Sequence, residues 1–123
     1  MSWTARGFEA YNNVGKQTVS GLVEGMIRIR GGAVLVYNNQ FTKTQSDTGS
    51  YTVKMDDENG DRGGVNPETR GSKIYIWGNT QTGASALNAG PYTLNVDYFL
   101  RAPTQAQDGV TYTPYPYPHQ LTL

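Results

Sequence analysis

Three acidic side chains form the first group of residues with the types and spacing to do chemistry. Asp56, Glu58 and Asp61 lie close together in a Gly-rich stretch, and carboxylate oxygens at this spacing suit Ca²⁺. The ligand order and the terminal Glu of an EF-hand loop are missing. The competing interpretation is a solvated loop tip in which Asn59-Gly60 forms a tight turn. The loop tip is the favoured interpretation, so we expect no cofactor, and Ca²⁺ is the one ion that this cluster could bind.

A second group combines cations, aromatic rings and one carboxylate at outward positions of predicted strands. Its members are Arg28, Arg30, Lys54, Lys73, Tyr75, Trp77 and Asp97. Aromatic rings offer contact area to sugar rings, and guanidinium groups bind carboxylates with two hydrogen bonds. If neighbouring strands align these residues, they form a surface for a polysaccharide, an acidic one in particular. In the competing interpretation the rings pack under another segment and the cations are solubilising surface charges.

No set of residues predicts catalysis. His119 is the only histidine, and neither a nucleophile nor an orienting acid lies near it in sequence. We therefore predict no catalytic residue. The Tyr-Pro repeats between Tyr112 and Pro118 could bind a proline-recognising domain, but capping of the fold by this tail is the favoured interpretation.

Short strands must position these groups, because glycine or proline interrupts nearly every window long enough for a helix. Alternating or β-branched runs predict strands at 8–13, 26–30, 33–37, 51–55, 74–77 and 92–100. The last should be the longest, with Leu94, Val96 and Tyr98 on one face. Residues 15–21, 42–50 and 80–90 read as polar turns or loops, and 56–72 as an irregular excursion.

A recurring phrase, an aromatic-tipped strand ending in Asn, predicts the architecture. Asn13, Asn39 and Asn79 end three such phrases and are 26 and 40 residues apart. Such intervals suit a parallel β-solenoid, in which equivalent corners stack and their Asn side chains form an amide ladder. We expect an all-β fold with about four rungs, in one domain over 1–123. Rungs fill 1–100, and 101–123 form an extended capping tail. The alternative is a small β-sandwich or irregular barrel.

These phrases resemble a known family. Residues 6–13, 29–41 and 74–80 look like rungs of right-handed parallel β-helix proteins of the pectate-lyase-like group. The ending, residues 97–103 and 112–121, is similar to the C-terminal ends of environmental bacterial β-helix proteins. The resemblance implies the end of a larger β-helix, expressed alone or encoded separately, as in a mobile gene cassette. The family's calcium-held acidic cluster and its basic catalytic residue have no residue-by-residue match here.

The resemblance and the missing catalytic set together give the functional expectation. We expect a non-catalytic β-helix module that binds carbohydrate weakly or has a structural, oligomerising role. The alternative is a polysaccharide-acting enzyme, lyase- or hydrolase-like, whose site is completed by oligomerisation. A short solenoid also exposes an open apolar end and unpaired strand edges, so we expect a homo-oligomer, namely a dimer packed end to end or edge to edge.

Composition argues against other classes. The 123 residues carry ten basic and ten acidic side chains without a basic cluster, which argues against nucleic-acid binding. No apolar run approaches the roughly 18 residues of a membrane span. There is no cysteine, which fits either a reducing or an oxidising compartment. The chain has no signal-peptide core and as written reads as cytoplasmic, although members of the family that it resembles are often secreted.

Overall fold

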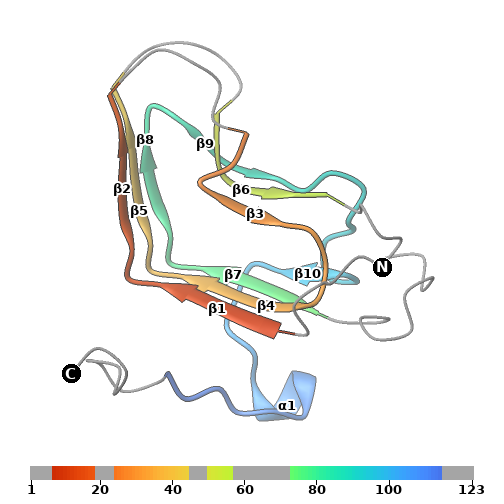
Figure 1. The fold of residues 1–123 in the computed structure, drawn as a ribbon. Coiled ribbons are helices and arrows are strands. Elements are labelled where there is room, and N and C mark those ends of the chain that lie inside the picture. Colours follow the sequence, from red (N-terminus) through yellow and green to blue (C-terminus); the bar gives the residue numbers. More distant parts are fainter. Residues whose placement is uncertain (1–6, 19–23, 45–49, 57–72, 115–123) are drawn as a thin grey trace.

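Short strands wind through successive parallel layers in a computed structural model of the chain (Figure 1). The structure describes residues 7–18, 24–44, 50–56 and 73–114. All strand pairs are parallel, and the strands form three sheets, here called A, B and C. Each of the first three layers contributes one strand to each sheet in turn, and β10 adds a fourth strand to sheet A. The fold is therefore a short parallel β-helix, as predicted, and not a sandwich or a barrel.

The three sheets contain ten strands among the described residues. Sheet A consists of β1 (Gly7–Tyr11), β4 (Ala33–Tyr37), β7 (Ile74–Trp77) and β10 (Tyr98–Phe99). Sheet B consists of β2 (Val14–Gln17), β5 (Gln40–Lys43) and β8 (Thr80–Thr82). Sheet C consists of β3 (Ile27–Ile29), β6 (Tyr51–Met55) and β9 (Ser85–Asn88).

Columns of aliphatic side chains fill the inside of the coil. Val34 and Val36 on β4 pair in register with Ile74 and Ile76 on β7, so the column continues from layer to layer. All four are buried, and Ile29, Val53 and Met55 of sheet C meet them from the other side. Full burial of one such side chain stabilises the fold by roughly 1.5–3 kcal/mol. Alternation along each strand then leaves the neighbouring residues on the outer face.

An asparagine ladder, formed by Asn13, Asn39 and Asn79, holds the corner between sheets A and B. The side-chain amide nitrogen (Nδ2) of Asn13 donates to Oδ1 of Asn39 (2.8 Å), and Nδ2 of Asn39 donates to Oδ1 of Asn79 (2.9 Å). The backbone N–H of each donor residue bonds to the same oxygen, at 3.0 Å in both cases. The predicted ladder is confirmed. Positive φ occurs one position before each ladder residue, at Asn12, Asn38 and Gly78.

Strand prediction was wrong where side chains are polar. Parts of the segments read as turns or loops form β2, β5, β8 and β9, which pair in register with neighbouring layers. Their backbone groups pair because the layers above and below hold them in place, and no hydrophobic pattern marks them in the sequence.

The segment 92–100 is not one long strand. Asn95 has a φ of 61°, and the N–H groups of Val96 and Asp97 both donate to the carbonyl of Thr93, which forms a turn. Only β10 remains of the predicted strand, and Leu94 and Val96 are exposed.

A single short helix is present among the described residues, although the sequence predicted none. It is α1 (Gln105–Asp108), which begins after the N-cap Thr104 and ends at Gly109, whose φ is 71°. No helix in the described ranges has the length and hydropathy needed to span a membrane.

Candidate functional site: a groove on the outer face of sheet A

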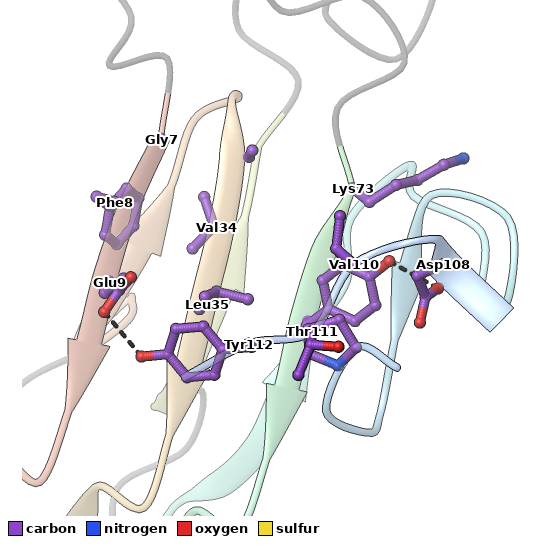
Figure 2. A pocket seen from close by; sticks show the side chains of 13 residues that line it. Gly7, Phe8, Glu9, Val34, Leu35, Lys73, Asp108, Val110, Thr111 and Tyr112 are labelled. Atoms are coloured by element: carbon purple, nitrogen blue, oxygen red, sulfur yellow. Dashed lines mark hydrogen bonds between the residues drawn. The ribbon is translucent and has the colours of Figure 1, made fainter. Parts of the chain in front are cut away.

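The C-terminal segment, residues 101–114, lies along the outer face of sheet A (Figure 1). A groove lies between this segment and the sheet (Figure 2). The groove has a volume of about 530 Å³. It is lined from sheet A by Gly7, Phe8, Glu9, Ala33, Val34, Leu35, Lys73 and Tyr75, and from the C-terminal segment by Pro103, Asp108, Val110, Thr111 and Tyr112. The predicted capping tail therefore lies, over its described part, on the side of the coil.

Asp108 anchors one end of the C-terminal segment. Its carboxylate accepts two hydrogen bonds from the Arg101 guanidinium (2.7 and 3.0 Å), one from the Thr104 N–H (2.7 Å) and one from the Tyr75 hydroxyl (2.8 Å). The bond from Arg101 is the main cause that lowers the pKa of Asp108 well below its ordinary value, against the opposing effect of burial. Burial, followed by the bond to Asp108, raises the pKa of Tyr75 to about 12.

Tyr112 anchors the other end. Its hydroxyl donates to a Glu9 carboxylate oxygen and lies within hydrogen-bond distance of the Tyr37 hydroxyl, at 2.8 Å in both cases. Burial, followed by the bonds to Tyr37 and Glu9, raises the pKa of the Tyr112 hydroxyl. The Tyr112 ring also meets the rings of Tyr37 and Trp77 edge-on, at interplanar angles of 73° and 77°. Figure 2 shows the ring reaching from the C-terminal segment toward Glu9 on β1.

Stacked rings stiffen the sheet next to this anchor. Tyr11, Tyr37 and Trp77 occupy the same position in three layers, and their centroids lie 4.9 and 4.4 Å apart with nearly parallel planes. Tyr75 stacks on Phe99 in the same way at 5.1 Å, with the Arg101 guanidinium 4.8 Å from the Phe99 centroid. The groove thus lies between two polar anchors on a rigid floor.

The surfaces of the groove combine apolar walls with a polar rim. Ala33, Leu35 and Tyr75 line the floor of the groove from sheet A, and Val110 lines it from the C-terminal segment. Glu9 supplies a carboxylate at one end, and Lys73 lies at the other, with its Nζ donating to the Val96 carbonyl at 2.5 Å. Such a site can bind a ligand that has both apolar faces and hydroxyl groups.

The predicted carbohydrate surface is divided by the fold. Lys73 and Tyr75 line the groove, and Trp77 lies beside it under Tyr112. Asp97 lies just before β10, where its side chain accepts the Thr93 N–H at 2.7 Å. The rings therefore pack under another segment, as the competing interpretation held. That Tyr75 and Trp77 bind sugar stays a prediction.

The predicted cations Arg28, Arg30 and Lys54 lie elsewhere. Arg28 and Lys54 are paired in register on sheet C, and Arg30 follows β3 directly. Arg28 bonds to Asp56 at 2.5 Å and to Glu24 at 3.0 Å, and Lys54 lies 3.3 Å from Glu24. Two acids and two bases form this network, so these charges face one another and not the groove.

The predicted calcium site falls mostly outside the described residues, which include Asp56 but not Glu58 or Asp61. Burial acts to raise the pKa of Asp56, but the hydrogen bond and charge of Arg28, helped by Lys54, lower it overall. Across the described ranges, no group of three or more His, Cys, Asp or Glu side chains is placed to hold a metal ion. His119 also lies outside the described residues.

Sequence reasoning missed the other residues that line the groove, among them Glu9, Ala33, Leu35, Asp108, Val110, Thr111 and Tyr112. Glu9 and Tyr112 are 103 residues apart, and no local pattern links them. The available signal was period-two alternation. Once β1 and β4 are placed side by side, Glu9 and Leu35 fall at the same outward position.

In comparisons with family models, curated proteins and solved structures, no match to this chain was found. The fold assignment therefore depends on the strand topology and register alone, and kinship with any family is a matter for proposal.

Proposed function

We propose that this chain is a non-catalytic β-helix module, related to the pectate-lyase-like group, whose groove on sheet A binds a carbohydrate chain weakly. The observation that carries the proposal is the groove itself. It is a hollow of about 530 Å³, preorganised by two hydrogen-bonded anchors, with an apolar floor and polar groups at its rim.

The chemistry of the lining supports a saccharide as the ligand. The C–H faces of a sugar ring pack against Leu35, Val110 and the edge of Tyr75, while its hydroxyls reach Glu9 and Thr111 at the rim. Lys73 gives acidic sugars an additional partner at one end. Because the ring faces of Tyr75 and Phe99 stack on each other, little aromatic face remains for the ligand, so we expect millimolar affinity.

Blocking the groove tests this proposal. Ala33→Trp places a large ring on the exposed floor, and we expect it to weaken oligosaccharide binding by about tenfold or more, equal to about 1.4 kcal/mol. Ala106→Trp is the matched control, because Ala106 is exposed on α1 and does not line the groove. Binding of neutral and uronic-acid oligosaccharides is followed by chemical-shift titration, with circular dichroism confirming that both variants fold.

The outcomes separate the alternatives. Absence of binding by the wild type at millimolar sugar, or equal loss in both variants, defeats the proposal. Release of shortened or unsaturated products would instead support the alternative expectation of a lyase- or hydrolase-like enzyme completed by oligomerisation, because a binding module returns its ligand unchanged.

A further inference from the structure

The two ends of the coil differ in how their edge strands are protected. In the first layer β1, β2 and β3 each carry a charged side chain, namely Glu9, Lys16 and Arg28. In contrast, the chain has no charged residue from 74 to 96, the range that contains β7, β8 and β9. Soluble proteins place charges on exposed edges to prevent pairing with other chains. At the C-terminal end, β8 and β9 lack this protection, whereas β10 has Asp97 directly before it.

The edge of the last layer also presents unpaired backbone groups. β8 and β9 are the outermost strands of sheets B and C. The N–H groups of Thr80 and Ser85 donate back to Asn39 and Ser50 of the preceding layer. Since successive residues of a strand turn their backbone groups to opposite sides, the N–H groups of Gln81 and Ala86 point away from the coil. No described strand lies on that side.

This end has a raised half and a recessed half. The raised half is residues 92–100, because β10 adds a fourth layer on β7. It carries three exposed apolar side chains, Leu94 (44%), Val96 (55%) and Leu100 (55%). The recessed half is β8 and β9, on which no described strand forms a fourth layer. Beside them is a hollow of about 200 Å³ lined by Ile76, Asn79, Gln81, Ala86, Leu87 and Leu100.

We propose that this end binds a second copy of the chain about a two-fold axis. A two-fold interface uses the same patch on both subunits, so the patch must be complementary to itself. A raised apolar half beside a recessed hollow meets that condition, since each copy's raised half seats over the other's β8 and β9. The pairing covers the exposed apolar side chains of the raised half and, in the partner, the open edges of β8 and β9.

Matched valine substitutions at opposite ends of the coil test the proposal. Val96 lies in the raised half, and Val14 lies on β2 of the first layer, where it is 78% exposed. We expect the wild type to sediment at twice the chain mass of 13.5 kDa at high micromolar concentration. Val96→Lys raises the dimer dissociation constant about tenfold or more, because it buries an unpaired charge, whereas Val14→Lys leaves it unchanged.

Hydrogen exchange provides a second readout that does not depend on mass. The Gln81 and Ala86 amides should exchange more slowly as wild-type concentration rises, and this protection should be lost in Val96→Lys. A wild type that stays monomeric overturns the proposal, as does dissociation by Val14→Lys but not by Val96→Lys. Species that grow beyond a dimer also overturn it, because they indicate head-to-tail contacts. This test is independent of sugar binding.

Discussion

Two neighbouring residues have different structural roles at each corner between sheets A and B. The first residue takes positive φ, which Asn tolerates better than other residues with a side chain, and the second enters the asparagine ladder. At the third corner the first residue is Gly78, and a Cβ there would lie 2.4 Å from Oδ1 of Asn38. The choice between Asn and Gly thus depends on the neighbouring layer as well as on φ.

Asn39 is the residue on which the ladder depends most. It is fully buried, and its amide nitrogen donates to Ala10 O, Tyr37 O and Asn79 Oδ1. We expect Asn39→Ala to lower the free energy of unfolding by about 3 kcal/mol, because buried donors and acceptors lose their partners. Urea denaturation measures this. Asn38→Gly is the control and should change stability by no more than ~1 kcal/mol, since Asn38 is exposed with positive φ. Equal losses would refute a role for the ladder.

At the level of elements, the C-terminal segment is held on sheet A by polar anchors at its two ends more than by burial. None of the residues of α1 is buried. Asp108 and Tyr112 supply the hydrogen bonds that connect the segment to β7, β4 and β1. Attachment of the segment should therefore respond to pH.

Stability should fall at both ends of the pH range. The pKa of Asp108 is lowered in the folded state, so the unfolded chain binds more protons and stability is lost as pH falls below about 4. The pKa of Tyr75 is raised to about 12, so the folded state keeps its proton longer and stability is lost between about pH 10 and pH 12. In plots of the urea midpoint against pH, the acid slope should be smaller in Asp108→Asn and the alkaline slope smaller in Tyr75→Phe. The remaining slopes come from Asp56, whose pKa is also lowered, and from Tyr112, whose pKa is also raised. Unchanged slopes would exclude these anchors.

The accuracy of each strand prediction depends on which interactions stabilise that strand. The strands β4, β6 and β7 were predicted with their observed bounds, because β-branched and aromatic side chains alternate in or fill them. The strands β2, β5 and β8 were missed because Lys, Gln and Thr give no periodic signal. Their pairing comes from register with other layers, which a single sequence does not display.

The residues of the groove were also predicted only in part from local sequence patterns. Tyr75 and Lys73 were correctly placed on an outward face, but the residues that complete the site come from β1, β4 and the C-terminal segment. Tyr112 was interpreted as part of a cap for the last rung. It lies instead against Tyr37 and Glu9, which are 75 and 103 residues away in sequence. The partner of a side chain at such separation is decided by topology, and local patterns do not contain it.

At the level of the whole molecule, the spacing in sequence between successive layers is not constant. The first two layers match with a constant offset of 26 residues, shown by Asn13 and Asn39, whereas Asn39 and Asn79 are 40 residues apart. Much of the additional length lies at 57–72, outside the described residues. In the first layer only Arg30, Gly31, Gly32 and Ala33 connect the equivalent positions Ile29 and Val34.

Replacing residues 57–72 by Gly-Gly should therefore leave the coil intact. Asp56-Gly-Gly-Lys73 then reproduces the length and glycines of the first corner, where Gly31 and Gly32 have positive φ. Shortening the connection makes loop closure easier by about 1 kcal/mol, so we expect an unfolding free energy equal to that of the wild type or slightly higher. Urea denaturation checks this, and failure to fold would show that the excursion is structural.

The same variant tests the predicted calcium site, because it removes Glu58 and Asp61. Calcium that raises the melting temperature of the wild type but not of the variant would locate the site in the excursion.

Paired residues of the first two layers are 26 positions apart in all three sheets. One layer therefore corresponds to one gene segment of fixed length. A tandem duplication of the gene segment for residues 7–32 would place the new unit between neighbours that already accept its corner, its core column and its stacked ring. Such a protein can lengthen through ordinary recombination, without a new packing solution at each step.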